Sequence, residues 1–495
     1  MTGMNTQSSD TAAGQSSDES AMSKSRILEV DKSCSVPVMF LLTWALAWLV
    51  GGGILAVISS IKLHGPGFLA GSAFLTYGRV QPASVNALLY GFGFQAAIAV
   101  ALWMIARLGQ AELMGRKGIL IGAVFWNLGV CLGVFGILGG ASTGHPMLEM
   151  PGFVSPLLLV SYSLMGAWAL ITLHFRQVRS LYVSQWYLLA ALFWFPWIFI
   201  AAQSALVFHP VRGALQFVIS SWYGHAVVAL WLVPVALAVM FYFIPKLLGR
   251  QLHSKHLAAF GFWTMALFAG WGGVQAGAPV PRWISSVGIV AGGLMVLPLI
   301  AVGMNWWITA RGAKPAQGDF VWGFIRFATV AFFAATLLDI GGRTRVIGEV
   351  TDLTVYSSGV YALYFYGVFG MSIAGAVYYL VPKITQTEWP SEKLVRWHYL
   401  GSMVGTVLIT AALVMGGVIQ GLRMNNPEIA FVDAIAKTVP FLGLSTLGGL
   451  ILVAANVAFL LNLVRLLTVC CRCCCCLPWN GTANGNKAAA VGANL

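Results

Sequence analysis

Charged residues are scarce in this sequence. Only 9% of its 495 residues are Asp, Glu, Lys or Arg, whereas 59% are hydrophobic. Soluble globular domains carry about 25% charged residues, so the composition excludes an ordinary soluble protein. Apolar runs of about twenty residues, which is the length a helix needs to cross a bilayer, recur along most of the chain. We therefore expect a polytopic membrane protein surrounded by a lipid bilayer.

Acidic residues are the rarer of the two charge signs, and the formal net charge is +13. The basic residues are scattered through short segments between the apolar runs. They form no cluster and no patch interleaved with aromatic residues, which nucleic-acid binding would need. A surplus of Lys and Arg is instead typical of the loops of membrane proteins. We therefore expect no nucleic-acid partner.

The eight cysteines lack the spacing of a disulfide framework. Six of them lie between Cys470 and Cys476, without the His partners that are typical of a zinc site. Two interpretations are open: lipid attachment beside the last membrane helix, or a tail under little functional constraint.

The apolar runs predict an all-α bundle of about twelve membrane helices. Residues 1–33 are rich in Ser, Thr, Gly and Asp, which predicts a disordered segment. The first apolar run starts too late for a signal peptide. Residues 34–468 form the predicted membrane domain, and residues 469–495 form a Cys-rich and then polar tail. The expected spans are 36–60, 83–107, 118–141, 152–174, 182–207, 218–245, 257–278, 284–310, 320–342, 354–382, 397–420 and 436–468.

The basic residues predict the orientation of this bundle. If the N-terminus is cytoplasmic, nineteen of the 28 Lys and Arg residues fall in cytoplasmic segments and eight fall in external ones. The remaining one, Arg326, lies inside the span 320–342. This asymmetry favours an even number of spans with both termini inside the cell.

Several short strings together resemble a known family. Trp222–His225 opens a long apolar helix that ends at Tyr242–Lys246, and a second helix ends at Tyr378–Lys383. The other strings are Gly78–Pro82, Asn86–Gly93, Trp397-His398 and Gly417–Leu422. In this order, over about residues 36–468, they resemble subunit I of cbb3-type cytochrome c oxidases, a branch of the haem-copper oxidases.

The resemblance implies a respiratory enzyme of a bacterial inner membrane, with haem b and copper as cofactors and c-type cytochrome subunits as partners. In the family, His residues of helices 2 and 10 bind a low-spin haem, and another His of helix 10 binds a high-spin haem. Three His residues of helices 6 and 7 bind copper beside a redox-active Tyr. Imidazole suits both metals.

Most of these ligand positions hold other residues in this chain. The helix 2 position is Ser84, and the two helix 7 positions are Gln275 and Ala276. The redox Tyr corresponds to Ala269. Only the helix 6 copper ligand is retained, as His225, and it is the single metal-site candidate. A lone His on an apolar helix is also commonly a hydrogen-bonded packing residue, so both interpretations of His225 are open.

Helix 10 admits two registers. Its ligand positions fall at Ser357 and Gly359, or at Val360 and Ala362. Neither register supplies a ligand, because no His occurs between His256 and His398. Tyr361 lies between the last two positions and would reach a haem only in a shifted register.

Asp339, at the end of the span 320–342, is a candidate for a proton route. It corresponds roughly to a Glu near the family's metal centre, and an acid within a membrane helix is a functional candidate by default. The alternative is an ion pair with Arg343 or Arg345.

Three functions follow from these observations. The first is a degenerate paralogue of subunit I that does not itself reduce oxygen. The second is an active terminal oxidase that couples cytochrome c oxidation to oxygen reduction and proton translocation. The third is a proton or solute carrier on the same scaffold.

Overall fold

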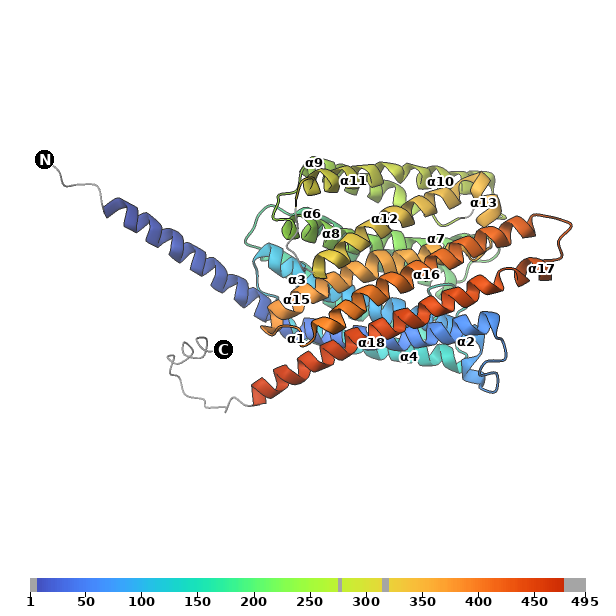
Figure 1. Ribbon diagram of the computed structural model, residues 1–495, viewed down its shortest axis with the longest axis horizontal. Coiled ribbons are helices and arrows are strands. Elements are labelled where there is room, and N and C mark those ends of the chain that lie inside the picture. Colours follow the sequence, from blue (N-terminus) through green and yellow to red (C-terminus); the bar gives the residue numbers. More distant parts are fainter. Residues whose placement is uncertain (1–6, 275–277, 314–319, 476–495) are drawn as a thin grey trace.

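The protein is a bundle of long, roughly parallel and antiparallel helices in the computed structural model (Figure 1). The structure describes residues 7–274, 278–313 and 320–475, with side chains between Ser25 and Val469. All regular elements within these ranges are helical. The α-helices are α1 (Gln7–His64), α2 (Tyr77–Asn86), α3 (Gln95–Gly109), α4 (Arg116–Gly139), α5 (Ser155–His174), α6 (Val183–Gln203), α7 (Ala214–Val227), α8 (Val233–Leu247), α9 (Lys255–Phe268), α10 (Arg282–Leu294), α11 (Val296–Ala310), α12 (Phe320–Arg343), α13 (Arg345–Thr351), α14 (Tyr356–Ala362), α15 (Met371–Thr385), α16 (Glu392–Met424), α17 (Phe431–Ala436) and α18 (Val439–Cys475).

Short segments of other helix types connect or interrupt these helices. Those of the π type are η2 (Ala87–Phe94), η4 (Ser204–Phe208), η5 (Val228–Leu232) and η7 (Leu363–Gly370). Those of the 3-10 type are η1 (Ala73–Leu75), η3 (Gly152–Val154) and η6 (Ala269–Trp271).

Eleven helical stretches of the described chain are long and apolar enough to cross a membrane. They account for eleven of the twelve expected spans. The other expected span, 257–278, is represented by α9 (14 residues) and η6 (3 residues), which together are shorter than the rest. Gly272 and Gly273 end this helix, because Gly273 has a φ of +105°. Residues 275–277 of the expected span lie outside the described residues.

The N-terminal boundary differs from the one expected at residue 33. Helix α1 begins at Gln7, and Val30, Asp31 and Ser33 are buried. Asp31 Oδ2 lies 2.6 Å from Arg107 Nη1 of α3, and Trp103 Nε1 donates to Asp31 Oδ1. The expectation of disorder is therefore wrong for residues 25–33, which are helical and partly buried. Their polar composition suggested disorder, but it could not reveal that Asp31 pairs with Arg107 of another helix. At the other end, α18 continues through Cys475, and residues 476–495 lie outside the described part of the chain.

Three continuous helices form the interior. These are α2–η2–α3, α7–η5–α8 and α14–η7–α15, whose most apolar windows are 100%, 94% and 72% buried. The other spans are at most half buried and surround them. Each interior helix contains a π segment, a feature that often marks a functional site in an α-helix. The ligand positions expected from the resemblance at Ser84, His225 and, in either register, 357–362 lie on α2, α7 and α14 of these interior helices.

Small residues allow the outer helices to approach closely. A Cβ atom on Gly405 of α16 would lie 2.8 Å from the carbonyl oxygen of Gly448 in α18, and one on Gly448 would lie 2.9 Å from that of Gly405. Such contacts are typical of membrane helix pairs. The start of α1 and the end of α18 lie at the same end of the bundle (Figure 1).

Candidate functional site

His225 lies in the last turn of α7 and is only 8% exposed. Its Nε2 atom is 3.0 Å from the carbonyl oxygen of Ala269, and its Nδ1 atom is 2.9 Å from Nη2 of Arg343. A carbonyl only accepts and a guanidinium only donates hydrogen bonds. Nε2 therefore carries the proton and Nδ1 presents its lone pair to Arg343. His225 is a neutral imidazole with both nitrogen atoms engaged.

Arg343 also forms an ion pair with Asp339, one turn earlier on α12. Its Nε donates to Asp339 Oδ2 at 3.1 Å, and its Nη2 lies 3.1 Å from Oδ1. The side chains of Arg343 and Asp339 are 15% and 28% exposed. Of the two candidate partners for Asp339, the structure therefore pairs it with Arg343, whereas Arg345 is exposed. We refer to His225, Arg343 and Asp339 as the polar triad.

Glycines make room for the polar triad. A Cβ on Gly272 would lie 2.4 Å from His225 Nε2 and 2.9 Å from Arg343 Nη1. A Cβ on Gly292 of α10 would lie 2.4 Å from Arg343 Cδ. A Cβ on Gly273 would lie 2.7 Å from the Ser221 carbonyl oxygen. Gly272 and Gly273, which follow η6, and Gly292 of α10 thus form a cradle around the polar triad in which a side chain at any of the three positions would collide with a neighbour.

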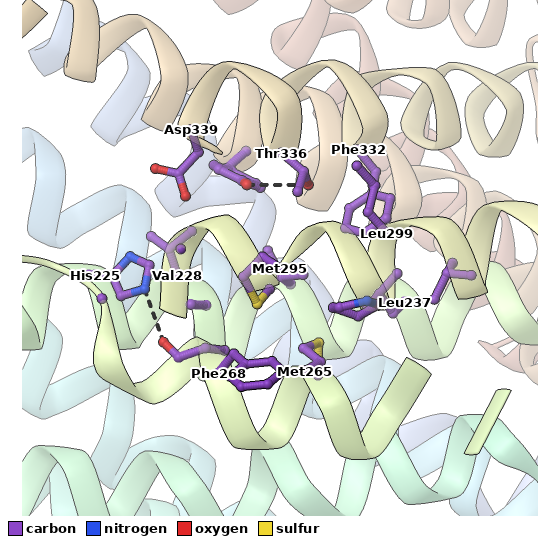
Figure 2. A pocket seen from close by; sticks show the side chains of 18 of the residues that line it. His225, Val228, Leu237, Met265, Phe268, Met295, Leu299, Phe332, Thr336 and Asp339 are labelled. Atoms are coloured by element: carbon purple, nitrogen blue, oxygen red, sulfur yellow. Dashed lines mark hydrogen bonds between the residues drawn. The ribbon is translucent and has the colours of Figure 1, made fainter. Parts of the chain in front are cut away.

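The polar triad borders two small cavities. One has a volume of about 40 Å³ and is mainly apolar, with Met265, Phe268 and Met295 among its lining residues. Figure 2 shows His225 and Asp339 on one side of this cavity and apolar side chains on the other. The second cavity has a volume of about 120 Å³ and a more polar lining. Asp339, Arg343 and Tyr361 border both, whereas His225 borders only the first.

The other positions that correspond to family ligands form hydrogen bonds or packing contacts within the bundle, where the structure describes them. Ser84 is buried and donates its hydroxyl to the Gln81 carbonyl oxygen at 2.7 Å. Ala269 contributes the carbonyl that accepts from His225. Gln275 and Ala276 lie outside the described residues. In helix 10, Gly359 packs on α16, where a Cβ would lie 3.0 Å from Leu413 and Val414.

Aromatic side chains fill the space between the interior helices α2–η2–α3 and α14–η7–α15, where the resemblance predicts a low-spin haem. The ring of Phe92 on η2 contacts the rings of Phe365 and Phe369 on η7, with centroids 6.1 Å apart in both pairs. Phe94 stacks on Trp231 at 3.7 Å. The cavity beside Phe92 has a volume of about 20 Å³, whereas small-molecule sites have volumes of about 300–1,000 Å³.

These observations test whether the described residues fit the family's cofactors. Both nitrogen atoms of His225 form hydrogen bonds, and the Ser84 hydroxyl donates a hydrogen bond within its own helix. Aromatic rings occupy the space between α2–η2–α3 and α14–η7–α15. Within the described ranges, no group of three or more His, Cys, Asp or Glu residues is arranged to hold a metal ion. The described residues therefore do not fit haem b or copper, and we derive no reaction step through either group.

Sequence reasoning missed two buried polar contacts. Asn86 Nδ2 donates to Glu149 Oε2 at 2.6 Å, which ties the loop after α4 to the end of α2. Burial raises the pKa of the Glu149 carboxyl, although Asn86 and backbone amides oppose this shift. His398, expected near a span end, is buried; its Nδ1 lies 3.0 Å from Tyr378 Oη, and its ring stacks on Phe459. The strings that contain Tyr378 and His398 could have suggested that these two residues pair. No pattern in the sequence indicated that Glu149 is buried beside Asn86.

The fold defines a polytopic helical protein whose spans are long and apolar enough to cross a membrane. Residues 36–451 match the family model described as cytochrome c and quinol oxidase polypeptide I. The chain belongs to this family, as the resemblance predicted.

Individual relatives agree with this assignment. The chain is 26% identical to a cytochrome c oxidase subunit 1 homolog of Agrobacterium tumefaciens, over 84% of this chain and 80% of that protein. It is 24% identical to the cbb3-type cytochrome c oxidase subunit CcoN1 of Stutzerimonas stutzeri, over 84% and 92% of the two chains. A solved haem-copper terminal oxidase dimer matches in fold with a TM-score of 0.63 at 15% identity, over 89% of this chain and 84% of that one.

Proposed function

We propose that this protein is a membrane subunit of a cbb3-like respiratory assembly that keeps the subunit I scaffold but does not itself reduce oxygen. The observation that carries the proposal is the polar triad. The lone pair of His225 Nδ1 faces a guanidinium, and Nε2–H is bonded to a backbone carbonyl. No electron pair on this imidazole is free for copper.

The packing between the interior helices α2–η2–α3 and α14–η7–α15 supports the same proposal. Low-spin haem requires two axial ligands, but Ser84 is bonded within its own helix and helix 10 has no His. The contacts of Phe92 with Phe365 and Phe369 give this region a filled core. The scaffold is thus stabilised by side-chain packing where its relatives would use prosthetic groups.

The proposed setting is a bacterial inner membrane, with both termini cytoplasmic and c-type cytochrome subunits as partners. The similarity to the Stutzerimonas protein supports the setting. The excess of basic residues in the assumed cytoplasmic segments supports the orientation, as do the two helix ends on one side of the bundle. Reporter fusions at both termini test the orientation, and affinity purification followed by haem staining tests the partners.

A reduced-minus-oxidised spectrum of the purified protein, combined with iron and copper analysis and oxygen-consumption measurements, tests the proposed function. We expect substoichiometric haem and copper and no oxygen consumption with reduced cytochrome c. Stoichiometric haem b and copper with turnover would establish the alternative, an active terminal oxidase.

A second candidate is a proton or solute carrier. The polar cavity of about 120 Å³ beside Asp339 favours it, because acids at such sites commonly mark ion pathways. Proton uptake by proteoliposomes under a membrane potential, compared between the wild type and Asp339→Asn, distinguishes this candidate from the first.

A further inference from the structure

The Arg343 guanidinium makes the contacts with His225 and Asp339 that a bound cation would make. Its guanidinium contacts the Nδ1 lone pair of His225 and both carboxylate oxygens of Asp339. An imidazole lone pair and a carboxylate are the groups that bind divalent transition metals such as Zn²⁺. The guanidinium thus lies between two potential metal ligands and engages both of them.

The surrounding backbone accommodates this arrangement. Gly292 leaves space for the Arg343 stem, because a Cβ there would approach Cδ to 2.4 Å. Gly272 leaves space for the guanidinium and the imidazole together. These contacts come from Gly292 of α10 and from Gly272 directly after η6, so two segments outside α12 leave room for Arg343.

We propose that Arg343 is a tethered cation that takes the place of a metal ion at His225, with Asp339 balancing its charge. The proposal rests on the proposed function, and it explains how the lone pair of His225 and the charge of Asp339 are stabilised without a copper ion. It has a specific consequence: removal of the guanidinium leaves the Nδ1 lone pair of His225 and the Asp339 carboxylate free, and creates a site for a divalent transition metal.

A cavity large enough for water adjoins this site. The polar cavity of about 120 Å³ borders Asp339 and Arg343 and also includes Asp352 and Ser357 in its lining. A cavity of this size holds several water molecules, since one needs about 10–15 Å³ by this measure. Water can complete the coordination of a metal that has only two protein ligands.

The test uses the full-length protein in detergent, and bound zinc is measured at equilibrium by dialysis against Zn²⁺. Arg343→Met keeps the aliphatic stem against Gly292 but removes the charge and the hydrogen bonds. We expect this variant to retain about one equivalent of zinc more than the wild type, and the His225→Ala/Arg343→Met double variant to lose it. Arg345→Met is the matched control, because Arg345 is an exposed arginine of α13, and it should behave as the wild type.

Two results would overturn the proposal. One is equal zinc retention by the wild type and Arg343→Met. The other is a wild type that already holds one equivalent of zinc in a His225-dependent manner. Neither depends on the haem content or oxygen consumption of the wild type, so failure here is distinguishable from failure of the proposed function.

Chemical rescue keeps the proposal testable if Arg343→Met folds poorly. In Arg343→Ala, millimolar guanidinium chloride should raise the thermal unfolding midpoint by binding between His225 and Asp339, whereas it should leave the midpoint of Arg345→Ala unchanged, because such concentrations are far below those that denature proteins. The absence of a guanidinium-specific gain, relative to an equal concentration of sodium chloride, would contradict a cation site at this position.

Discussion

Nη2 of Arg343 lies 2.9 Å from Nδ1 of His225, although 118 positions separate the two residues in the chain. The same guanidinium pairs with Asp339. Helices α7 and α12 are therefore joined by the hydrogen bond between Arg343 and His225, and the ion pair that holds Arg343 lies within α12. Breaking such a pair by removing one member is costly, because the remaining polar groups stay buried without a partner.

His225→Ala removes the imidazole from both of its contacts. The carbonyl of Ala269 and one donor of Arg343 then lose their partners, and we expect the free energy of unfolding to fall by about 1–3 kcal/mol. Thermal unfolding in detergent measures the change. His256→Ala, at an exposed position of α9, is the control and should leave the midpoint unchanged. Equal midpoints for both variants would argue against a stabilising role for His225.

Gly292→Ala tests the cradle around Arg343. The new methyl group would lie 2.4 Å from Arg343 Cδ, so the arginine must shift away from His225. We expect a loss of about 1–3 kcal/mol, typical of an overpacked interior. Gly293→Ala is a close control, because nothing lies within 4 Å of a Cβ at Gly293. If Gly292→Ala and Gly293→Ala have the same stability, the cradle is not rigid.

Gly421→Ala tests the packing of α16 on α13. A Cβ on Gly421 would lie 1.6 Å from the carbonyl oxygen of Val350, a backbone atom that cannot rotate away. We expect one of the largest losses of folded yield among Gly→Ala substitutions in this protein, measured by size-exclusion chromatography. Gly443→Ala in α18, where nothing lies within 4 Å, should give wild-type yield. A normal yield for Gly421→Ala would contradict the close approach of the two helices.

Glu149 predicts a pH dependence of stability. Burial raises the pKa of its carboxyl above the ordinary value of 4.5, so the folded protein holds this proton more tightly than the unfolded chain does. The contribution of Glu149 is therefore complete below pH 4.5, falls as the pH rises towards the raised pKa, and is constant above it.

Glu149→Gln should remove this part of the pH dependence, because the amide does not titrate and still accepts from Asn86. The measurement is the thermal midpoint from pH 4 to pH 8 for the wild type, Glu149→Gln and the exposed control Glu428→Gln. Parallel profiles for all three proteins would show that the Glu149 carboxyl has an ordinary pKa.

The arrangement of helices was largely predictable from the sequence. Apolar runs of about twenty residues have one stable solution in a bilayer, a helix that satisfies its own backbone, so the all-α membrane class follows from composition. The prediction for the span 257–278 was the least accurate, because the helix ends early at Gly272 and Gly273. These glycines leave space for His225, and a hydropathy pattern does not reveal such a close contact. The N-terminal boundary was also wrong, since the burial of Asp31 depends on Arg107, a residue of a different helix.

The sequence by itself determined the membrane class and the family resemblance, and it predicts that most family ligand positions hold other residues, because these inferences depend on residue types at positions along one chain. Only the tertiary structure decided which partner Asp339 has and what faces His225. Arg343 and Arg345 are both near Asp339 in sequence, but α12 directs Arg343 into the bundle while Arg345 opens α13 at the surface. Hydrogen-bond partners of a buried imidazole come from other helices, so their identity is a property of packing and not of local sequence.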